Sequence, residues 1–78
     1  MTQTRPIWAI AHDIRKDWKN VSPYALPYLT AMCTLESIED NYGWDSAKSI
    51  VNYFLANAGT WRGENAKRIK AELKTLCR

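Results

Sequence analysis

Apolar residues recur at every third or fourth position along most of this chain, and this spacing predicts α-helices. The first such segment, 6–19, starts with Pro6, which suits the first turn of a helix because its missing N–H would have no partner there. Its apolar stripe consists of Ile7, Ile10, Ala11, Ile14 and Trp18. The other side of the segment is polar, so we expect a helix with one face in the core.

The segment 23–35 is apolar on nearly all sides, which is typical of a short, central, buried helix. Ser22 and Pro23 form a helix-start signal, with Ser22 as the candidate N-cap. Pro27 would fall at the fifth helical position, where it removes a backbone hydrogen bond. We therefore expect either a short 3₁₀-like opening or a start between residues 25 and 27.

Two more helices are predicted, over 45–58 and 61–77. Asp45 or Ser46 is the candidate N-cap of the third helix. Gly59 is expected to end this helix in a left-handed conformation, and Thr60 is expected to cap the fourth. Their apolar stripes consist of Ala47, Ile50, Val51, Phe54, Leu55 and Ala58, and of Ala66, Ile69, Leu73, Leu76 and Cys77.

The longest irregular stretch is 36–44, where we expect Gly43 to adopt a positive φ in a turn. Ser37, with Asp40 three residues later, leaves a short extra helix over 37–42 open. No stretch alternates at the period of a β-strand. The pattern therefore predicts an all-α fold, in which residues 1–78 form a single domain that is a compact bundle of about four helices.

The chain is 78 residues long, close to the size below which an apolar core needs help from metals or disulfides. Its four tryptophans supply bulk to such a core. Cys33 and Cys77 are far apart and have no neighbouring metal-ligand pair, so we expect two reduced, partly buried thiols, with one disulfide as the alternative. No secretory signal or membrane-spanning stretch is found, so we expect a soluble cytoplasmic protein without a membrane partner.

Positive charge is concentrated at the end of the chain. Residues 1–60 hold five Lys/Arg against six Asp/Glu, a net charge of −1, whereas 61–78 hold six against two, a net charge of +4. At about 100° per residue, four of these cations fall within about 80° of one another on the fourth helix. They are Lys67, Lys70, Lys74 and Arg78. A helix face that only needs to be solvated more often mixes both signs.

The sequence predicts no catalytic residue, no cofactor site and no metal site. His12 is the one histidine, and its place on the polar side of the first helix indicates a solvated side chain rather than a general base. No phosphate-binding glycine loop, paired-histidine motif or nucleophile elbow is present. The carboxylates of 36–45 lack the ligand pattern of a calcium loop, so we expect a solvated acidic loop.

The last two helices and their short connection have the outline of a helix-turn-helix. Arg62 and Asn65 have base-reading chemistry, but on a regular helix their angles place them near Ile69, on the core side. The exposed stripe is mainly lysine, which suits phosphates and discriminates little between sequences. Sequence-specific recognition is therefore disfavoured. Non-specific nucleic-acid contact stays open, as does a solvated face that the acidic loop partly neutralises.

Aromatic residues are the second indication of a binding surface. Tyr53 lies well away from the core stripe of its helix, Trp8 lies at the edge of its stripe, and Trp61 lies at a helix end. Each can cover a small core, or they can act with Arg62 and the lysines as anchors for a protein partner. A homodimer is a further alternative, because a small domain gains stability by burying spare aromatic side chains.

Four motifs stand out along the chain: Ile14-Arg15-x-Asp17-Trp18, Pro27-Tyr28-Leu29-x-Ala31-Met32, Tyr42-Gly43-x-Asp45-Ser46-Ala47 and Tyr53-Phe54-Leu55-x-Asn57-Ala58-x-Thr60-Trp61-Arg62-Gly63-Glu64. They resemble those of a group of short proteins encoded by bacterial phages and other mobile elements, over about residues 5–76. The group has no assigned activity, so the resemblance implies no catalytic residues. It implies a cytosolic accessory protein, a class that includes inhibitors of host defence, regulators and packaging helpers.

These patterns together predict a non-enzymatic protein that binds a macromolecule, with a protein of acidic surface as the first choice. Inhibition of a host defence system such as CRISPR-Cas is one such role. The expected binding residues are the basic Arg62, Lys67, Lys70, Lys74 and Arg78 and the aromatic Trp8, Tyr53 and Trp61. The alternative is a regulatory or nucleic-acid-binding protein that uses the same lysines without sequence specificity.

Overall fold

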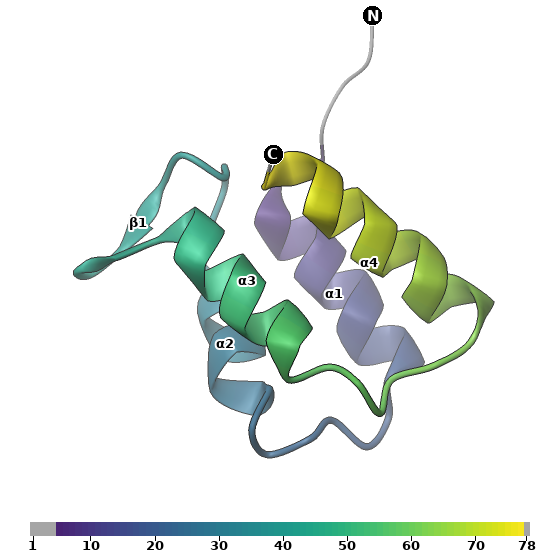
Figure 1. Cartoon of the computed structure of the whole chain (residues 1–78). Helices are drawn as coiled ribbons and strands as arrows, with labels where there is room; N and C mark the ends of the chain where they lie inside the picture. Colours follow the sequence, from purple (N-terminus) through teal and green to yellow (C-terminus); the bar gives the residue numbers. More distant parts are fainter. Residues whose placement is uncertain (1–4, 78) are drawn as a thin grey trace, which may run out of the picture.

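The computed structural model describes residues 5–77, which form four helices and one small hairpin (Figure 1). The elements in chain order are α1 (Ile7–Asp17), α2 (Leu26–Met32), β1 (Asn41–Tyr42), β2 (Asp45–Ser46), α3 (Ala47–Ala56) and α4 (Glu64–Leu76). The predicted compact, mostly helical fold with four helices is confirmed.

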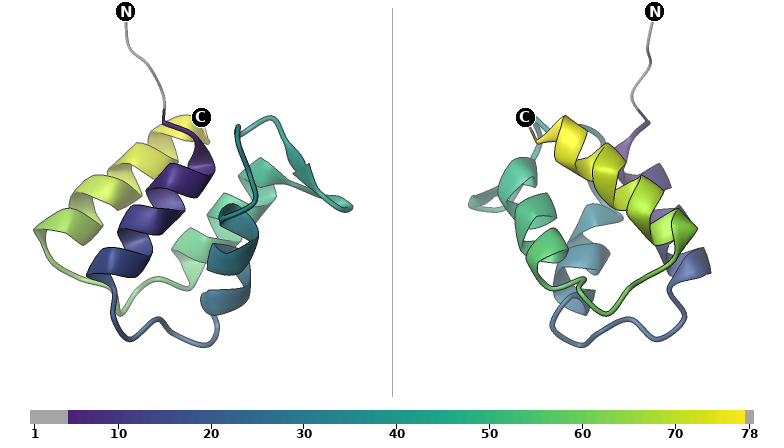
Figure 2. Two further views of the ribbon diagram at one scale, coloured as in Figure 1. Left: turned by 180° about the vertical axis from the view of Figure 1, so that it is seen from behind. Right: turned by 45° about the vertical axis from the view of Figure 1, so that its right-hand side comes forward.

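The helices form a closed ring in which each one packs against two others. α1 contacts α2 and α4, and α3 contacts the same two helices from the other side. α1 and α4 run antiparallel, side by side, as Figures 1 and 2 show. Arg5, just before α1, bonds Glu72 near the end of α4, while Asp17 at the end of α1 bonds Asn65 at the start of α4. The ring therefore has an α1–α4 side and an α2–α3 side.

One apolar core fills the ring. The largest fully buried side chains come from all four helices and are Ile7, Ile10, Ile14, Leu29, Met32, Val51, Phe54, Ile69 and Leu73. Leu29 and Met32 lie on the short α2, as expected for a central and buried segment. No buried side chain within residues 5–77 is polar or charged, so apolar contact is the main stabilising interaction of this small domain.

The start of α2 follows the second of the two expected alternatives. The helix begins at Leu26, so Pro27 is its second residue, where no intrahelical N–H bond is lost. Residues 23–25 form a turn, and the N–H groups of Ala25 and Leu26 both donate to the Ser22 carbonyl, at 2.9 and 3.0 Å. The helix ends at Met32, three residues before the expected boundary, yet Leu35 is still buried.

The start of α3 is capped as expected. Ser46 is the N-cap, and its hydroxyl oxygen accepts a hydrogen bond from the Ser49 N–H at 3.1 Å. Asp45 is instead part of β2, which precedes α3 without a gap. This continuity fixes the hairpin directly to the first turn of α3.

The junction between α3 and α4 differs from the expectation. α4 begins at Glu64, three residues late, and its N-cap is Gly63 at φ 115° with no side-chain cap. Thr60 therefore caps no helix, and Gly59 is not left-handed. The reason is Trp61, whose ring turns into the core and whose backbone N–H donates to the Ala58 carbonyl at 3.1 Å. The chain needs a non-helical bend here to bury that ring.

The hairpin contradicts the expectation that no strand is present. Asn41 pairs with Ser46 and Tyr42 with Asp45, around a two-residue loop. Gly43 has φ 63° and Trp44 does not have a positive φ, the backbone pattern of a type II′ turn. The positive φ of Gly43 was predicted, but strands of two residues are too short to give a visible alternation.

The extra helix left open over 37–42 does not form. Asp40 folds its carboxylate back instead, and Oδ2 accepts hydrogen bonds from the N–H groups of Glu36 and Ser37 at 2.9 and 3.0 Å. This turn follows the end of α2 and leads into the hairpin. The acidic loop is thus held in place by its own carboxylate.

Candidate binding surfaces

Trp61 is a core residue, so its expected role as an exposed aromatic anchor is wrong. The side chain is only 2 % exposed. Its ring stacks on Trp18 with a centroid distance of 5.7 Å and an interplanar angle of 10°, and it meets the edge of Phe54. The indole Nε1 donates to Asp17 Oδ2 at 2.8 Å. Trp61 therefore ties the start of α4 to the end of α1.

Lys70 is also held by the fold. Its ammonium donates to the backbone carbonyls of Ala58 and Trp61, at 2.8 and 2.7 Å, and lies 5.7 Å from the centre of the Trp61 ring. Burial lowers the pKa of Lys70, and the charges of Lys74 and Arg62 lower it further. Two of its three donors are thus used to close the α3–α4 junction. Lys70 contributes charge to the surface but is not free to reach a partner.

The remaining predicted cations form what we call the basic surface, defined as Arg62, Lys67 and Lys74. All three are exposed. Within residues 5–77 the two ion pairs both belong to Arg5, with Asp13 and with Glu72, so none of these three cations meets a carboxylate there. Arg78 lies outside the described residues.

Arg62 and Asn65 do not face the core, contrary to the angular expectation. Both are exposed. Arg62 precedes the helix, because α4 starts at Glu64, and the angle of a regular helix does not apply to it. Asn65 donates from Nδ2 to Asp17 Oδ1 at 2.9 Å. A hollow at this end of α4 is lined by Trp61, Arg62, Gly63, Ala66, Lys67 and Lys70.

Asp17 and Asp13 place carboxylates on the opposite flank of α4. Hydrogen bonds from Asn65 and then Trp61 lower the pKa of Asp17. A hydrogen bond from Arg5 lowers the pKa of Asp13, and hydrogen bonds to Glu72 and Asp13 raise that of Arg5. Asp13 and Asp17 line the groove between α1 and α4 together with Lys16 and Arg68, so this groove carries both signs of charge, whereas the basic surface carries one.

Charge is divided between the two sides of the ring. Residues 5–19 and 61–77, which contain α1 and α4, hold nine Lys/Arg against four Asp/Glu, a net charge of +5. Residues 20–60, which contain α2, the hairpin and α3, hold one against four, a net charge of −3. These values sum to +2, and Arg78 completes the +3 of the chain. The positive charge found in the sequence of residues 61–78 is therefore part of a wider separation of charge, positive on the α1–α4 side and negative on the α2–α3 side.

The α2–α3 side carries exposed aromatic and apolar side chains, and we call the Tyr28–Tyr53 pair at the seam between the two helices the tyrosine face. Tyr24 is 76 % exposed, Leu26 40 % and Tyr53 52 %. The rings of Tyr28 and Tyr53 touch across the seam between α2 and α3, with centroids 5.5 Å apart. The predicted exposure of Tyr53 is thus confirmed. The half-buried Tyr28 that meets it comes from another helix, and helical angles within one segment do not reveal this contact.

Two exposed tryptophans lie outside this face. Trp8 is 48 % exposed, as expected, and its Nε1 donates to Glu36 Oε1 at 3.1 Å. Trp44 is fully exposed in the loop of the hairpin, which projects from the helices beside α3 (Figure 1). The sequence signal for Trp44 was its position directly after Gly43, the residue expected to form a turn.

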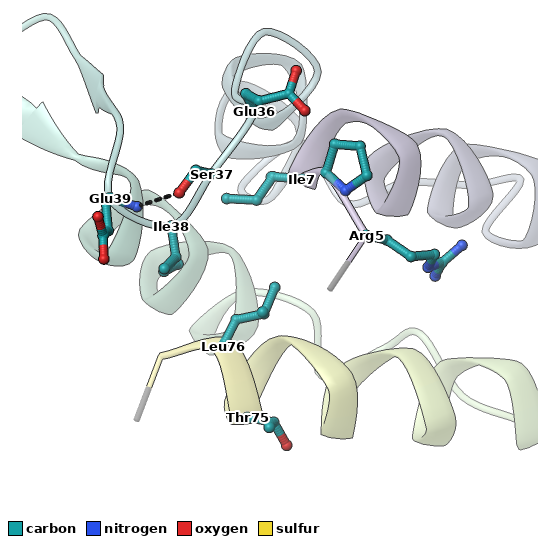
Figure 3. Close-up of a pocket in the computed structure, with 9 residues that line it drawn as sticks. Arg5, Ile7, Glu36, Ser37, Ile38, Glu39, Thr75 and Leu76 are labelled. Carbon is teal, nitrogen blue, oxygen red and sulfur yellow. Dashed lines mark hydrogen bonds between the residues drawn. The ribbon is translucent and has the colours of Figure 1, made fainter. Parts of the chain in front are cut away.

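An open groove of about 500 Å³ lies where the start of α1, the acidic loop and the end of α4 meet (Figure 3). Ile7, Ile38 and Leu76 give it an apolar lining, and Glu36 and Glu39 supply carboxylates. Figure 3 shows the Arg5 side chain directed away from Ile38. The groove can accept a cationic or apolar group, but it holds no arrangement of side chains typical of catalysis.

The described residues contain no group of three His, Cys, Asp or Glu side chains that could hold a metal ion. Cys33 and Cys77 are free and half-buried, and burial raises the pKa of Cys77. None of the helices in this part of the chain is long and apolar enough to cross a membrane. Comparisons with protein-family models, curated proteins and solved structures find no match for this chain.

Proposed function

We propose that this chain is a non-enzymatic protein that binds an acidic protein partner through the basic surface, Arg62, Lys67 and Lys74. The observation that carries the proposal is the lack of any carboxylate partner for these exposed cations within residues 5–77. Unpaired cations on and just before one helix attract an acidic surface and raise the rate of encounter. The resemblance to phage and mobile-element proteins supports the role of an accessory protein, such as an inhibitor of host defence.

The scaffold behind the basic surface supports this use. The Trp18–Trp61 stack and the bonds of Lys70 to two carbonyls fix the start of α4, so Arg62 and Lys67 stand on a supported segment. A charged surface on a fixed backbone loses less conformational freedom on binding than one on a loose segment. Lys70 thus positions the basic surface through its bonds to the Ala58 and Trp61 carbonyls.

Nucleic acid is the competing partner for the same cations. Lysine and arginine without a fixed hydrogen-bonding geometry suit phosphates, and such binding weakens steeply as salt rises. The carboxylate of Glu64 lies between Arg62 and Lys67 in the sequence and opposes a continuous phosphate track along α4. An acidic protein surface, with discrete carboxylates, fits three separated cations better.

The test compares two triple charge reversals. Arg62→Glu, Lys67→Glu and Lys74→Glu together change the net charge from +3 to −3. Arg15→Glu, Lys19→Glu and Lys48→Glu make the same change at exposed positions elsewhere and serve as the matched control. Each form is immobilised and exposed to nuclease-treated bacterial lysate. Every captured protein is then purified and titrated against all three forms, in parallel with a generic DNA duplex.

The proposal expects a captured protein whose affinity falls at least tenfold with the first triple variant and much less with the control. Equal losses in both variants would show a general effect of net charge and refute the assignment to α4. Binding to the duplex with a steep salt dependence, together with no captured protein, would assign the basic surface to nucleic acid. A circular-dichroism spectrum of each variant confirms that the helices are retained.

A further inference from the structure

Trp44 is the most exposed large apolar side chain within residues 5–77. It is fully exposed, whereas Tyr24 is 76 % exposed and Trp8 48 %. Tyr42, on the same hairpin, is also exposed. A tryptophan buries roughly 150–250 Å² when it is covered, so one left wholly in water is a large unused source of binding energy. Tryptophan is also among the side chains that most often anchor protein interfaces.

The hairpin that carries Trp44 is fixed to the helices. β1 and β2 are paired, and just beyond them the Ala47 N–H donates to the Asp40 carbonyl at 2.7 Å. Ser46 is both the last residue of β2 and the N-cap of α3. The hairpin projects beside α3 from this support (Figure 1). An anchor that is already held in position loses little conformational freedom when it binds.

The charge around the hairpin is entirely negative. Residues 36–46 hold four Asp/Glu and no Lys/Arg. Glu39 and Asp45 are exposed, and neither forms an ion pair within residues 5–77. Negative charge on both sides of Trp44 in the sequence opposes binding to a phosphate backbone or an anionic lipid surface. The chemistry that fits this hairpin is a hollow with room for an indole and with cations on its walls.

The hollow at the start of α4 has these properties. Its volume is about 300 Å³, and it is lined by Trp61, Arg62, Gly63, Ala66, Lys67 and Lys70. Three of these residues are cations, and none of them is a carboxylate. A cavity of roughly 150 Å³ admits a benzene ring, so this hollow has room for an indole. Arg and Lys beside an aromatic ring add a cation–π attraction.

The other hollows described above fit the hairpin less well. The groove in Figure 3 is lined by Glu36 and Glu39, and the α1–α4 groove includes Asp13 and Asp17. These carboxylates oppose those of the hairpin, because like charges brought together in a contact are unfavourable. The hollow at the start of α4 is therefore the best match in charge.

The hairpin and this hollow lie at opposite ends of α3 in the same chain. β2 leads directly into the first residue of α3, whereas the hollow begins beyond its last residue. The ten residues of α3 span about 15 Å, and Figures 1 and 2 show the hairpin on the far side of the molecule from the start of α4. A contact between the two elements therefore joins two molecules.

We propose that Trp44 of one copy of this chain binds in the α4 hollow of a second copy, where Arg62 and Lys67 attract the carboxylates of Glu39 and Asp45. The inference rests on the proposed function, because it names a second copy as an acidic partner for two cations of the basic surface. Two copies can exchange hairpins around a two-fold axis or join head to tail. Both arrangements contain this contact and give a mass above that of one chain.

The first test measures molar mass by light scattering from about 1 to 500 µM. Wild type is expected to rise above the 9.0 kDa of one chain, and to do so less at high salt. Trp44→Ala should weaken self-association at least about tenfold, because it removes the anchor. Tyr24→Ala is the matched control, since it truncates an exposed aromatic side chain elsewhere, and it should associate like wild type.

A second variant alters the hollow instead of the hairpin. Arg62→Glu with Lys67→Glu should also weaken self-association at least about tenfold, because the cations become carboxylates. Arg15→Glu with Lys19→Glu gives the same net charge, −1, at exposed positions elsewhere and should associate more tightly than the α4 pair. A circular-dichroism spectrum of each variant confirms that the helices are retained.

Mixing two defective chains tests the contact directly. Trp44→Ala keeps the hollow, and Arg62→Glu with Lys67→Glu keeps the hairpin, so an equal mixture should form one contact and stop at twice the single-chain mass. The control mixture combines Trp44→Ala with a chain that carries Trp44→Ala, Arg15→Glu and Lys19→Glu. It has the same net charges but no intact hairpin, and it should not associate.

Three results would overturn the inference: a wild-type chain that stays monomeric at the highest concentration, a Trp44→Ala chain that associates as well as wild type, and a mixture that associates no better than its control. A monomeric chain that still captures a lysate protein through Arg62, Lys67 and Lys74 overturns this inference alone and supports the proposed function. Self-association that both pairs of charge reversals weaken equally overturns the role of the α4 hollow, whatever the lysate test shows.

Discussion

Replacing Trp61 with alanine tests the finding that this residue holds α4 in place. The change removes a ring that is 2 % exposed, stacked on Trp18 and in edge contact with Phe54, and it deletes the donor to Asp17. Truncation of a buried tryptophan costs about 3–5 kcal/mol. A 78-residue domain has a total free energy of unfolding of about 4–12 kcal/mol. The variant is therefore expected to lose a large share of its stability.

Trp44→Ala is the matched control, because it makes the same chemical change at a fully exposed position. Its free energy of unfolding should stay within about 0.5 kcal/mol of wild type. Urea unfolding followed by far-ultraviolet circular dichroism is the suitable measurement, since each variant keeps three of the four tryptophans and fluorescence baselines would shift. A Trp61→Ala protein that lost less than about 1 kcal/mol would refute the packing described for this ring.

Two further predictions concern a turn and acid stability. Gly43→Ala should destabilise the chain by about 1–2 kcal/mol, because the φ of Gly43 is +63°. Gly59→Ala should stabilise it by about 0.4–1 kcal/mol, because no atom lies within 4 Å of the added Cβ. Urea unfolding of the two variants and wild type measures both changes. The pKa of Asp17 is lowered below 3.8 in the folded chain, so the unfolded state binds more protons and stability is lost as pH falls through the acid range. Asp17→Asn should flatten the decline of the unfolding midpoint between about pH 5 and pH 2, and an unchanged decline would contradict this role.

The helices were predictable because their apolar stripes are regular. Ile7, Ile10 and Ile14 on α1 and Ile69 and Leu73 on α4 occupy the predicted core positions, and all are buried. Periodicity alone establishes which side of a long helix faces inward. The ends of the helices were less predictable, because capping residues, glycines, prolines and buried side chains favour different boundaries within a few residues of each other.

The α3–α4 junction shows this competition. Gly59 and Thr60 give an ordinary stop-and-start signal, yet the helix begins after Gly63. The burial of Trp61 decides the outcome, since placing its ring beside Trp18 is worth more than three additional helical residues. Because α4 begins at Glu64, Arg62 lies before the helix, and the angle predicted for its side chain was wrong for that reason. Local signals do not contain the position of Trp18, which comes from another helix.

The tyrosine face was unpredictable for a related reason. The absence of charge in 20–35 is visible in the sequence, and so is the outward position of Tyr53. That α2 and α3 lie side by side, with Tyr28 against Tyr53, depends on how the ring closes. A surface built from two helices needs their packing as well as their periods.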